Sequence, residues 1–245
     1  MSERIHSIEI RSNQDLVEDV VTFEPEACLG LIDDLTQTIY LPFRGTTSNT
    51  ERAILPAEPC VEHRENDAEH TFHIATVVNQ LWQQRQQLEI IFPDDYDPLL
   101  ALSYTLDHDV LEIHAGDVDS MTRDPVLKQF KRSNEKAAAA IIRLAHPSLA
   151  PIADNSEQYE KKDNSTARFV NDLDKIAPIR VICADGGRRW HNWQGTATSR
   201  KFMVETVRKK LLTPFGHVML DAIEEDLAAH PEYFPDECNY QGRLF

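Results

Sequence analysis

The chain lacks closely spaced cysteines and long apolar runs. None of its four cysteines forms a C-x-x-C motif, so we expect thiols in a reducing compartment and no disulfide scaffold. No apolar run approaches the roughly 18 residues of a membrane span, and the charged residues 1–14 lack the apolar core of a secretory signal. We therefore expect a cytoplasmic protein that does not associate with membranes.

Positive charge is also scarce. The 25 Lys and Arg residues are outnumbered by 41 Asp and Glu residues, which gives a net charge of -16. Such a field repels the backbone of nucleic acids and anionic lipids, so we expect no nucleic-acid polymer as a partner. A small anion is still compatible with this charge, because a metal ion and one or two arginines can invert the field locally.

Strand signals are rare, and glycine occurs only 8 times. Most apolar residues recur at the spacing of amphipathic helices, and Ser165 or Thr166 is a suitable cap for one of them. We predict an all-α fold with one domain over residues 26–235, an N-terminal extension over 1–25 and a tail over 236–245. The expected helices span residues 27–40, 69–88, 99–113, 134–145, 165–183, 199–212 and 215–229.

Four side chains of metal-ligand type lie inside three of these expected helices. They are His70, the adjacent pair His108 and Asp109, and Asp174. Imidazole and carboxylate groups hold divalent metals, so the pattern predicts one ion between three helices. Asp174 is the most informative, because a carboxylate beside an apolar stripe must be paired or bind a cation, whereas Asp172 points roughly the other way. Taken singly, each histidine is more often a core or surface residue.

Glu112 is a candidate acid or base. It follows His108 by four residues and Asp109 by three, so on one continuous helix these side chains would share a face. A carboxylate that is not itself a ligand could then act on water or on a substrate oxygen at the ion. The spacing therefore makes Glu112 a candidate either for support of a metal ligand or for acid/base catalysis.

Three sequence blocks resemble those of the HD-domain metal-dependent phosphohydrolases. They are H-R-E-N-D-A-E-H-T-F-H-I-A (63–75), L-D-H-D-V-L-E-I-H-A-G-D (106–117) and R-F-V-N-D-L-D-K-I (168–176). The similarity extends over about residues 27–235 and is to the branch of the bacterial 5'-deoxynucleotidase and the eukaryotic HD-domain-containing protein 2. It implies a helical HD domain, a homodimer, and one divalent ion bound by the four residues His70, His108, Asp109 and Asp174.

The resemblance also implies further site residues. The two acidic residues that act beside the metal in the family fall on Glu112 and Asp117, and the substrate-binding arginine falls on Arg52, with Arg44 as the alternative. Ala115 replaces the Ser or Thr that often precedes the Gly-Asp of the second block, which leaves substrate preference open. No paired-histidine motif occurs between the second and third blocks, so one metal is expected instead of two.

The expected activity is hydrolysis of a nucleoside 5'-monophosphate, in its deoxy form, to nucleoside and phosphate. The metal is open among Mn, Co, Mg, Fe and Zn, because ligands of this kind accept all of them. Two alternatives remain. The protein could be a nucleoside triphosphohydrolase or another small phosphate ester hydrolase, or it could be a non-catalytic HD protein that binds nucleotides for regulation.

Overall fold

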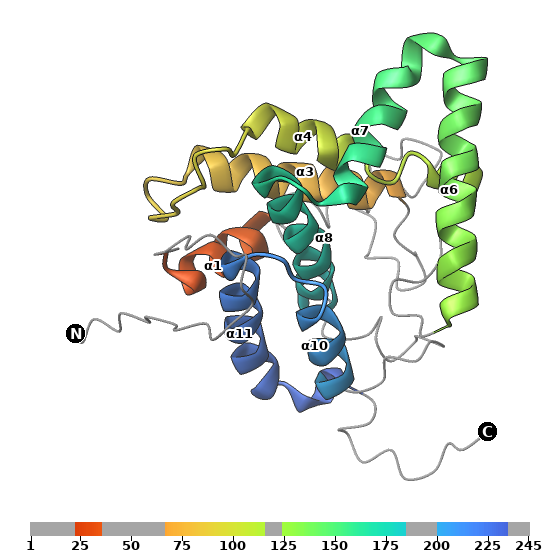
Figure 1. Cartoon of the computed structure of the whole chain (residues 1–245). Coiled ribbons are helices and arrows are strands. Elements are labelled where there is room, and N and C mark those ends of the chain that lie inside the picture. The colour runs from red at the N-terminus through yellow and green to blue at the C-terminus, as the bar shows by residue number, and fades with distance from the viewer. Residues whose placement is uncertain (1–22, 36–66, 116–123, 185–199, 235–245) are drawn as a thin grey trace, which may run out of the picture.

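Every regular element in the described part of the chain is helical, which confirms the predicted all-α fold (Figure 1). The computed structural model describes residues 23–35, 67–115, 124–184 and 200–234. None of the helices within these ranges is long and apolar enough to cross a membrane. The helices are α1 (Pro25–Leu35), α3 (Asp67–Gln83), α4 (Pro98–Asp107), α5 (Glu112–Ala115), α6 (Pro125–Ala145), α7 (Ala150–Lys161), α8 (Ser165–Ala184), α10 (Arg200–Arg208) and α11 (Pro214–Ala228), with short 3-10 turns at Pro147–Leu149 and Pro231–Tyr233.

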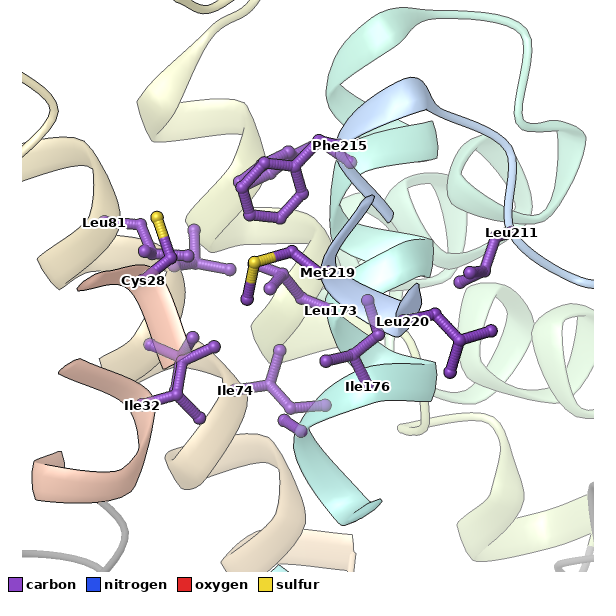
Figure 2. Close-up of a cluster of buried hydrophobic side chains, with 14 of the residues drawn as sticks. Cys28, Ile32, Ile74, Leu81, Leu173, Ile176, Leu211, Phe215, Met219 and Leu220 are labelled. Atoms are coloured by element: carbon purple, nitrogen blue, oxygen red, sulfur yellow. The ribbon is translucent and has the colours of Figure 1, made fainter. Parts of the chain in front are cut away.

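Helix α8 lies among the other core helices and packs against α1, α3, α4 and α11 (Figure 1). The side chains between them are apolar and fully buried, as Figure 2 shows for Ile74 and Leu81 of α3, Leu173 and Ile176 of α8, and Met219 of α11. Burial of such side chains is the dominant favourable term in folding. This core fixes α3 and α8, which carry two of the predicted ligands, relative to each other.

A second, smaller apolar cluster joins α6 and α7 to the segment that follows α4. It consists of Leu111, Ala138, Ala139, Ile142 and Ala153. Helix α6 packs against both α5 and α7, and α7 packs against α4. Because of these contacts, the His108–Asp109 pair is enclosed by helices that are distant from it in the sequence.

The single helix predicted over residues 99–113 is wrong. Helix α4 ends at Asp107 and α5 begins at Glu112. In the turn between them, the N–H groups of Val110 and Glu112 donate to carbonyl oxygens three residues back, at 3.2 and 2.9 Å, so this segment is wound more tightly than an α-helix. His108 and Glu112 therefore do not share one helix face.

Helices α3 and α10 end at Gln83 and Arg208, before the predicted residues 88 and 212, and two further helices differ more from the prediction. Helix α6 begins at Pro125 instead of residue 134, because Asp124 caps it by accepting a hydrogen bond from the N–H of Val126 at 2.8 Å. Helix α7 was not predicted, since it carries few apolar residues and has a proline, Pro151, near its start. Both helices contribute to the site.

The cap of α8 is Asn164, not Ser165 or Thr166. The Asn164 Oδ1 accepts a hydrogen bond from the N–H of Ala167 at 2.8 Å. Thr166 has a different function, because its hydroxyl accepts a hydrogen bond from the N–H of Asp97 at 2.9 Å. This bond ties the start of α8 to the start of α4.

Asp172 is buried on α8 and faces the connection between α10 and α11. Its carboxylate accepts hydrogen bonds from the N–H groups of Leu212 (2.8 Å) and Thr213 (2.9 Å), the Thr213 hydroxyl (2.6 Å) and the Asn171 amide (3.0 Å). A Cβ atom added at Gly216 would lie 2.3 Å from Asp172 Oδ2. Only a glycine therefore fits at this position of α11.

Candidate metal centre

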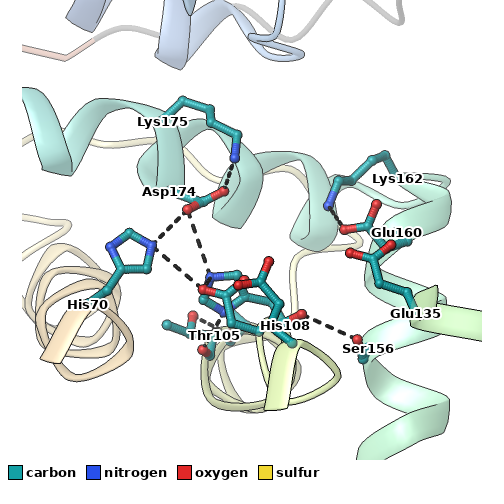
Figure 3. Close-up of polar contacts among 12 residues, drawn as sticks. His70, Thr105, His108, Glu135, Ser156, Glu160, Lys162, Asp174 and Lys175 are labelled. Carbon is teal, nitrogen blue, oxygen red and sulfur yellow. Dashed lines mark hydrogen bonds and ion pairs between the residues drawn. The ribbon is translucent and has the colours of Figure 1, made fainter. Parts of the chain in front are cut away.

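The structure brings together the four side chains that were predicted as metal ligands. His70 is on α3, His108 and Asp109 follow α4, and Asp174 is on α8. Figure 3 shows His70, His108 and Asp174 facing one another. The Nε2 atom of His70 lies 2.9 Å from Asp174 Oδ1 and 4.0 Å from Asp109 Oδ2. The Nε2 atom of His108 lies 3.0 Å from Asp109 Oδ2 and 3.8 Å from Asp174 Oδ1.

One ligand atom from each of His70, His108 and Asp109 lies within 4.8 Å of the other two. Ligand atoms around one metal ion at about 2.0–2.2 Å are separated by distances of this order. Asp174 Oδ1 adds a fourth ligand atom, the second oxygen, which approaches both imidazoles. The arrangement can therefore hold one divalent cation with two nitrogen and two oxygen ligands.

The environment of His108 fits a metal ligand. Its Nδ1 lies 2.8 Å from the carbonyl oxygen of Thr105, and since a carbonyl can only accept, Nδ1 carries the proton. In the neutral ring the Nε2 lone pair then points into the cluster, where Nε2 is buried and makes no hydrogen bond of acceptable geometry, although Asp109 is close. A backbone carbonyl that fixes the tautomer in this way is typical of metal-ligating histidines.

The two carboxylates make this cluster attractive to positive charge. Burial alone would lower the pKa of His108, but the nearby carboxylates of Asp109 and Asp174 raise it to about 10. Burial opposes ionisation of Asp174 too, yet Lys175, His108 and His70 hold its pKa well below the usual range. A divalent cation would supply the charge that a proton on His108 supplies in the metal-free protein.

Lys175 orients the ligand Asp174. Its ammonium group donates to Asp174 Oδ2, which leaves Oδ1 turned toward the two imidazoles. This partner was not identified from the sequence, although it follows Asp174 directly. Residues that orient metal ligands through a second hydrogen bond contribute measurably to metal affinity.

We expect Lys175→Met to weaken metal binding by about tenfold or more, because Asp174 loses the partner that fixes its orientation. Titration of the metal-free protein with Mn²⁺, followed by calorimetry, measures this change. Lys128→Met is the matched control, since Lys128 is an exposed lysine on α6. Equal affinities of the two variants would show that Lys175 does not position the ligand.

Glu112 is buried, and its carboxylate pairs with a lysine that was not expected beside it. Lys131 of α6 donates to Glu112 Oε1 at 2.5 Å and lies 3.7 Å from Glu135 Oε1. Glu112 remains one tight turn from the ligand Asp109, whose carbonyl accepts the Glu112 N–H. Three other predicted site residues, Asp117, Arg52 and Arg44, lie outside the described residues.

Helix α7, which was not predicted from the sequence, supports the site. The Ser156 hydroxyl donates to the carbonyl oxygen of His108 at 3.3 Å, and the Asn155 amide donates to Asp107 Oδ2 at 2.8 Å. The Tyr159 ring packs edge-on against the His108 ring, with centroids 5.6 Å apart. The polar pattern of α7 predicts no helix, so these contacts were not predictable from spacing.

Comparison with known proteins identifies the family. A profile described as HD domain matches residues 48–211, whereas no match was found among curated proteins. The fold is similar to the crystal structure of a predicted metal-dependent phosphohydrolase from Magnetospirillum magnetotacticum MS-1, with a TM-score of 0.54 and 21% sequence identity over 86% of this chain and 99% of that chain. The profile spans well over half of the sequence, and the chain therefore belongs to the HD domain family.

Proposed function

We propose that this protein is a metal-dependent phosphohydrolase that converts nucleoside 5'-monophosphates, in their deoxy form, to nucleoside and phosphate. The observation that carries the proposal is the cluster of two imidazoles and two carboxylates around the buried Nε2 of His108. The name of the Magnetospirillum protein and membership of the HD domain family support a phosphohydrolase. The nucleotide substrate rests on the resemblance of the three sequence blocks.

In this proposal His70, His108, Asp109 and Asp174 hold one divalent ion. The bound ion would polarise a phosphoryl oxygen and lower the pKa of a water molecule. Water then attacks phosphorus, and the 5'-oxygen leaves and gains a proton.

Proton transfer is assigned to acidic side chains of the second block. Glu112 or Asp117 orients or deprotonates the attacking water, or protonates the departing 5'-oxygen. The ion pair of Glu112 with Lys131 favours the ionised carboxylate, which suits a base better than an acid. Arg52, with Arg44 as the alternative, neutralises phosphate charge in this proposal. Homodimer formation and a cytoplasmic location are also proposed.

The proposal is tested by release of orthophosphate from a panel of nucleoside mono-, di- and triphosphates. The purified protein is stripped with EDTA and supplied singly with Mn²⁺, Co²⁺, Mg²⁺, Fe²⁺ or Zn²⁺. We expect orthophosphate from 5'-monophosphates with at least one metal, and none from the stripped protein. Deoxy and ribo forms of each base in the panel reveal sugar and base preference.

Other products would indicate a different function. Pyrophosphate or tripolyphosphate in place of orthophosphate would indicate a nucleoside triphosphohydrolase. If the protein binds the metal but hydrolyses none of the nucleotides, the proposed substrate is wrong. Nucleotide binding without turnover would favour a regulatory protein.

A further inference from the structure

Two lysines lie beside the metal centre and belong to neither the predicted ligands nor the predicted acids. Lys175 is on α8, and Lys162 is the C-cap residue that directly follows α7. Figure 3 shows both side chains on one side of the site, with the ammonium of Lys175 turned toward Asp174 and that of Lys162 toward Glu160. Two cations from different segments therefore approach the same carboxylate-rich region.

The backbone of Lys162 adopts a conformation that is unfavourable for lysine. Its φ is 53° and its ψ is 30°, in the left-handed region, and its N–H donates to the carbonyl oxygen of Tyr159 at 3.1 Å. Helices commonly end in this way with glycine, which has no Cβ atom and adopts the conformation at little cost. Helix termination alone does not explain a lysine here, and backbone outliers of this kind cluster at functional sites.

The burial of the Lys162 side chain is also unfavourable. Only 18% of it is exposed, and burial lowers its pKa to about 8. The nearest carboxylate oxygen, on Glu160, is 3.6 Å away, and the ammonium nitrogen lies 2.8 Å from the centroid of the Tyr159 ring. The same ring packs against His108, so Lys162 and this candidate ligand both contact Tyr159.

The positive charges of the two lysines repel each other. Burial is the main cause of the lowered pKa of Lys162; Glu160 and Asp174 raise that pKa, and Lys175 lowers it through repulsion. The carboxylates of Glu160 and Asp174 offset part of the positive charge of the two lysines, and a further anion would add to this stabilisation. A group with two negative charges next to the metal would interact favourably with both ammonium groups.

We propose that Lys162 and Lys175 form a receptor for the phosphoryl group of the substrate, beside the metal centre. The ligand class is a terminal phosphate dianion, as in a phosphate monoester or free inorganic phosphate. This inference rests on the proposed phosphohydrolase function and adds the residues that bind the phosphoryl group. Charge-assisted hydrogen bonds from ammonium groups to phosphate are strong enough to be measured singly.

The test measures binding of inorganic phosphate to the full chain saturated with Mn²⁺. We expect Lys162→Met to raise the dissociation constant of phosphate by about tenfold or more and to raise KM for the monophosphate substrate more than it lowers kcat. Lys162→Arg retains the charge and should bind phosphate within a few-fold of the unaltered protein. The matched control is Lys161→Met, because Lys161 is the exposed neighbouring lysine on α7.

Lys162→Gly is a second test that does not depend on the methionine variant folding. Glycine relaxes the backbone at this φ, so this variant should unfold at a temperature no lower than that of Lys162→Met and still lose phosphate affinity. Equal phosphate binding by Lys162→Gly, Lys162→Met and Lys161→Met would overturn the proposal. If the protein hydrolyses monophosphates but the Lys162 variants bind phosphate as tightly as the unaltered protein does, only this inference is refuted. If phosphate binding depends on Lys162 but no monophosphate is hydrolysed, only the proposed function is refuted.

Discussion

Asp109→Ala is expected to abolish metal binding and turnover together. Asp109 Oδ2 lies 3.0 Å from His108 Nε2 and 4.0 Å from His70 Nε2, so its loss removes the oxygen between two nitrogen ligands. Metal affinity should fall by at least about 100-fold, more than for loss of an orienting residue. Because the metal contributes several kcal/mol to transition-state stabilisation, kcat should fall by roughly three orders of magnitude. Calorimetry with Mn²⁺ and phosphate release measure the two effects.

Two variants separate loss of the metal from other effects. Asp94→Asn is the control, because Asp94 is exposed in the turn between α3 and α4, and this variant should retain metal binding and activity. Glu112→Gln should retain the metal yet lose about 100-fold or more in kcat, as expected for a general base. Equal activity of Asp109→Ala and Glu112→Gln would refute the division into ligand and base.

Asp172→Ala is expected to have the largest effect on stability. The substitution leaves the partly buried N–H groups of Leu212 and Thr213 without their acceptor, the buried carboxylate of Asp172, and a donor that loses its partner in this way costs about 1–3 kcal/mol. Thr213 also caps α11, where its hydroxyl accepts a hydrogen bond from the N–H of Gly216 at 3.0 Å, so the damage extends to that helix. We expect a loss of about 3 kcal/mol and a decrease in Tm of roughly 10 °C.

Asp221→Ala provides the comparison for this effect. Asp221 is on α11 and pairs with Arg208 at 2.6 Å, but its side chain is 53% exposed. Exposed ion pairs contribute at most about 1 kcal/mol, so this variant should unfold within a few degrees of the unaltered protein. Similar denaturation midpoints for Asp172→Ala and Asp221→Ala would mean that Asp172 does not hold the α10–α11 connection.

The sequence predicted the parts of the fold that depend on apolar periodicity. The helices around Ile74, Leu173 and Met219 were expected because their buried residues recur at helical spacing. The side chains brought together at the centre were expected as well, since imidazole and carboxylate groups inside apolar helices need a partner.

The rest depended on interactions that periodicity does not reveal. Helix α7 has a weak apolar pattern and is held by tertiary contacts such as the hydrogen bond from Ser156 to His108. Helix α4 ends at Asp107 although no glycine or proline, the residues that usually mark a helix end, lies next to this position. Because the helix ends there, Glu112 pairs with Lys131 of α6. The left-handed backbone of Lys162 likewise occurs at a residue type that does not favour it.

One turn of α8 has a consequence for how the protein can change in evolution. Four successive residues serve four different neighbours: Asp172 binds the α10–α11 connection, Leu173 fills the core, Asp174 faces the imidazoles and Lys175 binds Asp174. A helix presents successive residues about 100° apart, so none can take over the function of the next. Substitutions that alter substrate preference should therefore accumulate elsewhere in the chain, while these four positions tolerate almost no exchange.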